Sequence, residues 1–197
     1  MPFLTPPIDT LKKTQFYVLR SIAPHLGVSF TLQKMAQTFI KQNKKVLIFD
    51  TLLGLKNFPL VNKNQDKIPT VLAGILPLSE LIVKEKGVDV ITGCANQNLT
   101  ALTTYQQQYL KESLKQLATN YDIVLIDMPC QVTLPTWAEL GENMWVVSAD
   151  KEIICNTLAS SQPNPHLILN LQKDMDTLNQ VYAFIKILSP ACQITIF

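Results

Sequence analysis

The stretch KVLIFD (residues 45–50) decides the fold, because four consecutive apolar residues run directly into the carboxylate of Asp50. YDIVLID (residues 121–127) repeats the pattern and ends at Asp127. A strand that is apolar at nearly every position is typical of a parallel sheet covered on both faces. We therefore expect two neighbouring buried strands whose carboxyl ends, with Asp50 and Asp127, meet at the edge of the sheet where ligands bind.

Other short apolar segments alternate with longer segments of helical periodicity. The sequence predicts strands over residues 16–19, 46–49, 88–91, 123–126, 145–147 and 167–169, and leaves open a last strand over 194–196. It predicts helices over residues 30–42, 105–119 and 177–188. This alternation predicts an α/β fold with a mostly parallel central sheet and helices on both faces.

Length and composition fit one folded domain. The 197 residues are 47% hydrophobic and 16% charged, which is typical of a chain with a buried core. We expect a flexible N-terminal arm over residues 1–15 and a single domain over residues 16–197. Residues 58–69 are expected to form a surface loop. The segment before residue 167 is expected to be too short for a full crossover helix, because Pro163 and Pro165 interrupt it.

Charge and cysteine usage exclude several classes of protein. A net charge of +2 without a basic stripe argues against nucleic-acid binding. The four cysteines lack any CxxC pair and the two histidines lie far apart, so we expect reduced thiols and no metal site. The N-terminus does not resemble a signal peptide, and the last predicted helix lacks the basic face of a membrane-targeting helix. The cysteine usage, and not the absence of a signal, leads us to expect a cytoplasmic protein.

The stretch RSIAPHLGVSFT (residues 20–31) lies between the first predicted strand and the first predicted helix. A nucleotide-binding protein carries its phosphate loop at this point, with glycines that expose backbone N–H groups and a lysine that neutralises phosphate charge. This stretch contains one glycine, Gly27, and no lysine.

KKVLIFDTLLGLKN (residues 44–57) resembles a segment of MinD and of the flagellar-number regulators, in the MinD/ParA branch of the P-loop ATPases. That family reads K-K-V, two hydrophobic residues, D-x-D, a hydrophobic residue and G-L-x-N. Four further segments are similar to family segments in the same order: GVDVITGC (87–94), YDIVLIDMPC (121–130), MWVVSADKEI (144–153) and LILNLQ (167–172). The resemblance spans residues 16–170 and implies a P-loop NTPase-like fold, trimmed at the C-terminus.

The family loop reads S-G-K-G-G-V-G-K-T-T. Aligned without gaps from Asp50, it places Gly27 on the last glycine and Ser29 on the Mg²⁺-binding threonine. The two family lysines then fall on Ala23 and Val28. A two-residue shift would instead place Phe30 on the phosphate-binding lysine, and the register stays open. In both registers both lysines are lost, so the stretch resembles a degenerate Walker A loop.

The resemblance implies a vestigial nucleotide site formed by Gly27, Ser29, Asp50, Asp127 and Asn170. Asn170 takes the place of the asparagine that contacts adenine, and if Mg²⁺ binds, Ser29, Asp50 and Asp127 would hold it. Leu52 replaces the family aspartate that positions the attacking water, and Pro24 removes one backbone N–H from the loop. We therefore expect no catalytic residue and no resident cofactor, with weak binding of Mg-ATP or ADP left open.

Three interpretations follow. The first is a degenerate MinD/ParA-like protein, a pseudo-ATPase scaffold that helps to position or regulate a flagellum, pilus or division site through a protein partner. The second is a divergent but active ATPase that binds Mg-ATP. The third, compatible with the first, is an α/β domain that binds no nucleotide, because apolar Val28, Phe30 and Leu52 fill the former pocket. Because Ala23 replaces the lysine that crosses between subunits, a homodimer would not be switched by ATP.

Overall fold

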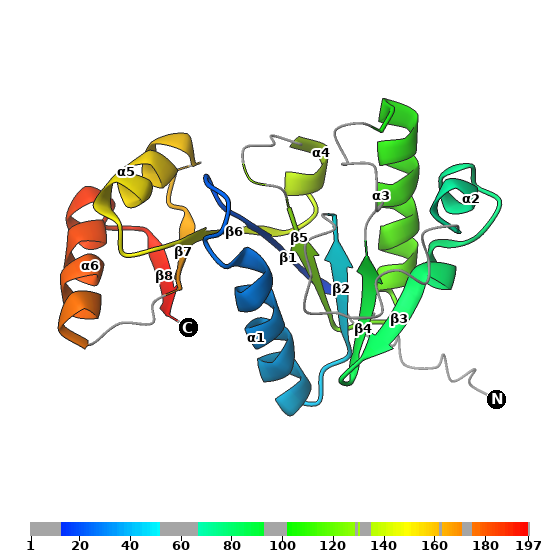
Figure 1. Cartoon of the computed structure of the whole chain (residues 1–197), viewed down its shortest axis with the longest axis horizontal. Helices are drawn as coiled ribbons and strands as arrows, with labels where there is room; N and C mark the ends of the chain where they lie inside the picture. Colours follow the sequence, from blue (N-terminus) through cyan, green and yellow to red (C-terminus); the bar gives the residue numbers. More distant parts are fainter. Residues whose placement is uncertain are drawn as a thin grey trace, which may run out of the picture.

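The computed structural model describes residues 13–51, 67–92, 102–128, 130, 135–161, 163–170 and 175–196. Within them, eight strands form one sheet in the order β3-β4-β2-β5-β1-β6-β7-β8 (Figure 1). The strands are β1 (Gln15–Arg20), β2 (Val46–Asp50), β3 (Ile82–Glu85), β4 (Val88–Thr92), β5 (Ile123–Asp127), β6 (Glu142–Val147), β7 (His166–Leu169) and β8 (Gln193–Ile196). The helices are α1 (Val28–Lys41), α2 (Ile68–Leu72), η2 (Leu78–Leu81, a 3-10 helix), α3 (Thr104–Ala118), α4 (Pro135–Ala138), α5 (Lys151–Ser160) and α6 (Met175–Leu188).

The paired strands are parallel except for β3 and β4, which are antiparallel. The mostly parallel α/β sheet predicted from the sequence is therefore confirmed. All six predicted strands are present, and the open segment at residues 194–196 forms β8. The three predicted helices correspond to α1, α3 and α6, with ends that differ from the prediction by no more than a few residues.

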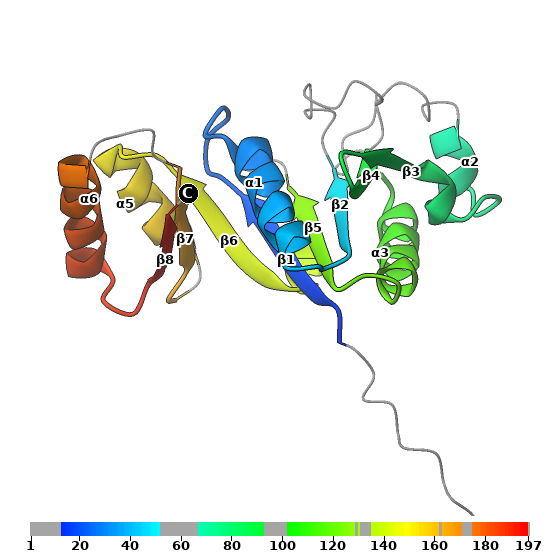
Figure 2. The same cartoon turned by 90° about the horizontal axis from the view of Figure 1, so that it is seen from below.

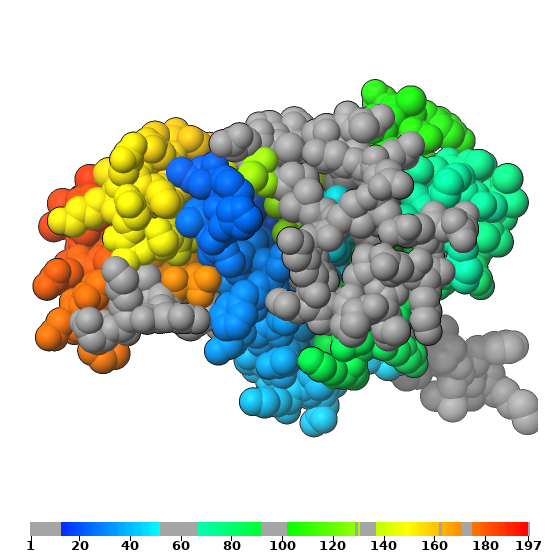
Figure 3. All heavy atoms as spheres, viewed as in Figure 1, coloured from blue at the N-terminus to red at the C-terminus, as the bar shows by residue number. Residues whose placement is uncertain are grey.

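The two faces of the sheet are covered differently. Leu32, Met35 and Ala36 of α1 pack on one face, in a core cluster that includes residues of β1, β2 and β5. On the other face α2, η2 and α3 cover β1, β2 and β5, while α5 and α6 cover β6 and β7. Figures 2 and 3 show the result: α5 and α6 form one end of the molecule, and α2 and α3 form the other.

Aromatic packing fixes the short helix α4 against the sheet. Trp137 is fully buried, and its ring stacks on Phe49 of β2 with a centroid distance of 5.5 Å and an interplanar angle of 6°. Aromatic pairs of this kind add to the stability that burial alone supplies. Helix α4 was not predicted from the sequence, because four residues carry too little periodicity.

Strand β3 was also missed by the sequence analysis. It pairs with β4 through a two-residue turn in which Lys86 and Gly87 both have positive φ, 48° and 84°. Two-residue turns with positive φ at both positions match the twist of antiparallel strands. A four-residue strand followed by Lys-Gly is too short to stand out in the sequence.

The prediction that the segment before β7 is too short for a crossover helix was wrong. Helix α5 has ten residues. It begins because the Asp150 side chain accepts hydrogen bonds from the backbone N–H groups of Glu152 and Ile153. It ends at Ser160, before Pro163, so the prolines lie in the connection to β7 and leave the helix intact.

Two expected boundaries also change. Ile68 and Pro69 belong to α2, where the sequence analysis expected a surface loop over residues 58–69. Residues 58–66 of that expected loop lie outside the described residues. Strand β1 begins at Gln15, one residue inside the expected arm, and the Thr14 hydroxyl donates to the Ala118 carbonyl (2.8 Å).

His166 joins the last three strands on the face that carries α1. Its Nδ1 lies 2.6 Å from Oε1 of Glu142 on β6, and its Nε2 lies 2.8 Å from Oγ1 of Thr195 on β8. Cross-strand side-chain pairs of this kind stabilise a sheet. The contacts of His166 with Glu142 and Thr195 therefore link the edge strand β8 to β6, inside the sheet.

A glycine is required where β6 begins. A Cβ atom at Gly141 would lie 2.2 Å from the carbonyl oxygen of Phe16 and 2.6 Å from its carbonyl carbon. We expect Gly141→Ala to lower the free energy of unfolding by about 2–3 kcal/mol, because backbone atoms of β1 must move to admit the methyl group. Urea denaturation monitored by circular dichroism measures this.

Gly87→Ala is the matched control. A Cβ atom there would meet nothing within 4 Å, so its cost comes from the positive φ of 84° alone. That strain costs about 1 kcal/mol. Equal losses in the two variants would contradict a packing role for Gly141.

Candidate functional site

The start of α1 is bonded to the end of β5. Gly27 lies at the N-cap of the helix with a φ of 82°, a conformation that favours glycine. Ser29 lies in the first turn, and its hydroxyl donates a hydrogen bond of 2.7 Å to Oδ2 of Asp127. The helix N-terminus, with its free backbone N–H groups, therefore faces a carboxylate at the carboxyl edge of the sheet.

The two strand-end carboxylates are neighbours, as the sequence predicts. Asp50 and Asp127 are paired in register on β2 and β5, and both are buried. Strand alternation places both side chains on the face that carries α1. Thr51 closes the end of the sheet, because its hydroxyl donates to the backbone carbonyl of Asp127.

Burial changes the acidity of Asp127. Desolvation raises the pKa of this carboxyl from 3.8 to about 6, and the hydrogen bond from Ser29 opposes that rise. A cation bound beside Asp127 would offset the desolvation cost and so favour the ionised form of this carboxyl.

Asn170 closes over the loop between β1 and α1. It follows β7 directly, and its Nδ2 donates a hydrogen bond of 3.1 Å to the backbone carbonyl of Leu26. The same Nδ2 lies 2.1 Å from the position that a Cβ atom at Gly27 would take. Gly27 is therefore needed both for its backbone conformation and for the close approach of Asn170.

The loop itself is built differently from a glycine-rich phosphate loop. His25 has a positive φ of 61°, and the Ser21 hydroxyl donates to the Ala23 carbonyl at 2.7 Å. Pro24 has no N–H to offer. Val28, the first residue of α1, packs against the apolar cluster that contains Leu19 and Leu32.

These residues fit a Mg²⁺-nucleotide only in part. Ser29 and Asp127, with Asp50 beside them, are the oxygen ligands that Mg²⁺ takes together with phosphates and water. The sequence has no lysine between Lys13 and Lys34, so no loop lysine can neutralise phosphate charge. Among the described residues, no group of three or more His, Cys, Asp and Glu side chains is arranged to hold a metal.

The structure gathers all five residues that the sequence analysis singled out. Gly27 contacts Asn170, Ser29 bonds Asp127, and Asp50 lies beside Asp127. Their role toward a nucleotide stays a prediction. Neither the bond between Asn170 and the loop nor the role of Thr51 was predicted from the sequence, although a hydroxyl residue directly after Asp50 was a usable signal.

The interpretation of an apolar filled pocket needs correction at Phe30. This side chain is 40% exposed, and Nζ of Lys34 lies 5.1 Å from the centroid of its ring. Phe30 is therefore on the surface of α1 and does not fill the site. Of the other two residues, Val28 does pack against the core, and Leu52 lies outside the described residues.

Comparison with solved structures shows the fold. The MinC:MinD cell division protein complex of Aquifex aeolicus matches with a TM-score of 0.68 at 18% identity, over 93% of this chain and 81% of that one. A putative plasmid partition protein from Borrelia burgdorferi B31 bound to AMPPNP matches with a TM-score of 0.65 at 21% identity, over 88% and 81%. Cobyrinic acid a,c-diamide synthase from Mycobacterium smegmatis with bound ADP and magnesium matches with a TM-score of 0.62 at 17% identity, over 87% and 82%.

The chain therefore has the α/β fold that the resemblance to the MinD/ParA-type ATPases implied. At these identities the likeness shows the fold alone. No protein-family model matches the sequence, and no curated protein matches it significantly. No helix in the described part of the chain combines the length and hydrophobicity that crossing a membrane requires.

The contact between Gly27 and Asn170 predicts a non-additive pair of variants. Gly27→Ala should cost about 1–2 kcal/mol through its left-handed backbone and about 1 kcal/mol more by displacing the Asn170 amide from Leu26. In an Asn170→Ala background only the first cost remains. The double-mutant cycle, measured by urea denaturation, should therefore show a coupling of about 1 kcal/mol. Strict additivity would mean that the amide does not hold the loop.

The raised pKa of Asp127 predicts a pH-dependent stability. Because the folded pKa, about 6, exceeds the ordinary 3.8, the stability that this carboxyl allows is complete below about pH 3.8 and falls as the pH rises through 6. Asp127→Asn should therefore stabilise the protein at pH 7.5 by about 2–3 kcal/mol, and the difference should vanish near pH 4.

Urea denaturation of both proteins across this range measures the difference. Asparagine keeps an oxygen that can accept the bond from Ser29, so it isolates the charge. A constant difference between the two proteins at every pH would contradict the assignment.

Proposed function

We propose that this chain, built on the fold of the MinD and plasmid partition proteins, is a degenerate member of the MinD/ParA group that works as a pseudo-ATPase scaffold. It holds a protein partner and does not hydrolyse ATP. The placement of a cell-surface machine, such as a flagellum, pilus or division site, is the role that this resemblance favours, and it would be exercised in the cytoplasm.

The observation that carries the proposal is the position of Val28. Ser29 lies one residue into α1 and bonds Asp127, which supports the ungapped register with the family loop. Val28 then stands where the family carries its phosphate-binding lysine, and its side chain packs against the apolar core. A lysine–phosphate contact is worth about 1.5–3 kcal/mol, so its loss lowers nucleotide affinity roughly tenfold to a hundredfold.

Asn170 supports the same conclusion. In the family the corresponding asparagine contacts adenine, whereas here its amide donates to the Leu26 carbonyl and packs on Gly27. That bond occupies one of the two N–H groups of the amide and fixes the orientation of the side chain. In this structure the Asn170 side chain therefore stabilises the loop before α1.

A protein partner is proposed by analogy with the structural relatives. One of them is described as a complex of MinC with MinD, a cell division protein. Ala23 stands where the family has the lysine that crosses to the second subunit, so a homodimer of this chain would form without an ATP switch.

The second candidate, a divergent Mg-ATP-binding ATPase, is favoured by one observation. Ser29, Asp50 and Asp127 lie together at the start of α1, and their oxygens are of the kind that Mg²⁺ accepts as ligands. Weak binding of Mg-ATP or ADP through these oxygens would require the loop to supply backbone N–H groups in place of the lysine.

Calorimetric titration of the full chain with Mg-ATP and Mg-ADP, to millimolar nucleotide, tests the proposal. We expect no saturable heat and no ATP hydrolysis above the buffer rate, because the loop lacks the lysine that balances phosphate charge. Binding with a micromolar Kd would overturn the scaffold proposal and favour the ATPase. Asp127→Asn is the control, since binding at this site should weaken in that variant while binding elsewhere should not.

A further inference from the structure

A half-buried arginine lies beside the site, on the opposite face of the sheet from α1. Arg20 is the last residue of β1 and is paired in register with Trp145 of β6. Its guanidinium carbon lies 4.1 Å from the centroid of the Trp145 ring, a cation–π contact. The Nε atom of Arg20 is buried and has no hydrogen-bond partner within the described part of the chain.

Asn143 brings an orphan acceptor to the same place. It lies two residues before Trp145, so strand alternation places it on the same face of β6. Its Nδ2 donates to the carbonyl oxygens of Ala138 (2.8 Å) and Gly141 (3.3 Å), which fixes the orientation of the amide. Its Oδ1 is buried and, like Nε of Arg20, finds no partner among the described residues.

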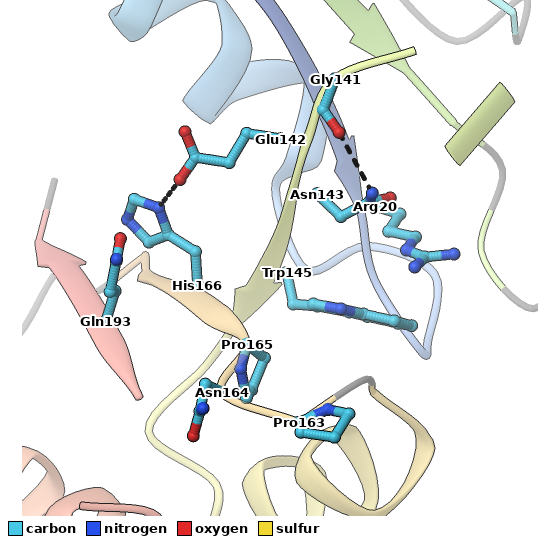
Figure 4. A pocket seen from close by; sticks show the side chains of 10 residues that line it. All are labelled: Arg20, Gly141, Glu142, Asn143, Trp145, Pro163, Asn164, Pro165, His166 and Gln193. Carbon is cyan, nitrogen blue, oxygen red and sulfur yellow. Dashed lines mark hydrogen bonds and ion pairs between the residues drawn. The ribbon is translucent and has the colours of Figure 1, made fainter. Parts of the chain in front are cut away.

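Both side chains line one cavity of about 420 Å³. It is open to solvent, and Figure 4 shows the residues that line it, among them Trp145 and the connection at Pro163, Asn164 and Pro165. Glu142 also lines the cavity, but its carboxylate is directed to His166 at 2.6 Å. The guanidinium therefore has no carboxylate of its own in the described lining. We call this space the Arg20 cavity.

Leaving such groups without partners costs free energy. A buried donor or acceptor that loses water without gaining a partner is destabilising, and a charged donor more so. The pKa of Arg20 is lowered from its ordinary value because burial disfavours the charged form. An anion in the cavity would offset this desolvation, and the contact with the Trp145 ring orients the planar guanidinium.

We propose that the Arg20 cavity binds a carboxylate that carries a neighbouring N–H group. The carboxylate accepts from the guanidinium of Arg20, and the N–H donates to Oδ1 of Asn143. A planar carboxylate matches the guanidinium fork in two parallel bonds. A phosphate dianion would leave charge unbalanced beside Glu142, because Arg20 is the one guanidinium in the described lining.

This chemistry occurs at the C-terminal residue of a polypeptide and in a free N-acyl amino acid. Both have a carboxylate one carbon away from an amide N–H, so the cavity would see the same groups from either source. The prolines and Trp145 offer apolar surface to the rest of the ligand.

The test uses nuclear magnetic resonance on the full ¹⁵N-labelled chain, following the Nε–H of Arg20 and the indole N–H of Trp145. The probes are N-acetylglycine, acetate and N-acetylglycinamide. We expect saturable shifts at both groups with N-acetylglycine and binding about tenfold weaker with acetate, which lacks the N–H. N-acetylglycinamide, without a carboxylate, should cause no saturable shift.

Variants separate the cavity from general charge effects. Arg20→Lys keeps the charge but loses the fork, and Asn143→Asp places a repelling carboxylate, so each should weaken N-acetylglycine binding about tenfold or more. Lys34→Gln is the matched control: it removes a cation that also lies over an aromatic ring, on the surface of α1, and should leave binding unchanged. Thermal melts show which variants are folded.

Several outcomes would overturn the proposal: no saturable shift with any carboxylate in the wild-type chain, equal binding of N-acetylglycine and N-acetylglycinamide, or unchanged binding in whichever of the two cavity variants folds. Inorganic phosphate binding in place of carboxylates would also overturn it. A longer acetylated peptide with a free C-terminus distinguishes the two sources. Tighter binding than N-acetylglycine indicates a polypeptide terminus, and weaker binding indicates a free acid, with the carboxylate assignment supported in either case.

Discussion

The burial of β2 and β5 on both faces is the constraint on which the rest of the structure depends. A strand that contacts helices on each side can carry polar side chains only at its ends, because a polar group within it would be desolvated without a partner. Asp50 and Asp127 therefore lie together at one edge of the sheet. The N-terminus of α1 lies against the same edge, and the bond from Ser29 to Asp127 fixes the start of the helix. The position of the candidate site therefore follows from the burial of β2 and β5 on both faces.

Much of this could be predicted from the sequence, because the central strands depend on local pattern. VLIFD and IVLID are apolar at every position before the final aspartate, which is typical of strands in a sheet covered on both faces. Helices α1, α3 and α6 were predicted because their apolar residues repeat at helical spacing over fourteen or fifteen residues. Shorter elements such as β3 and α4 offer too few residues for a periodic signal. Helix α5 was not predicted because of the prolines that follow it, although the helix ends before them.

The finer parts of the site could not be predicted, because they depend on contacts between residues far apart in the chain. Asn170 and Leu26 are separated by 144 positions, and neither local sequence predicts their hydrogen bond. The same is true of Arg20 and Trp145, which meet only because β1 and β6 are neighbours in the sheet. Residue type suggested which positions could bind a nucleotide. The packing of Val28 against the core and the hydrogen bond of Asn170 become visible only in the fold.

The positions of the two tryptophans have a consequence for spectroscopy. Trp137 is stacked on Phe49 in the core cluster shared with α3, whereas Trp145 lies in the cluster that α5 and α6 close. The intrinsic fluorescence of the protein is therefore divided between its two ends. Replacing either indole with phenylalanine leaves a single emitter, and the two resulting unfolding curves reveal whether both halves of the sheet melt as one cooperative unit.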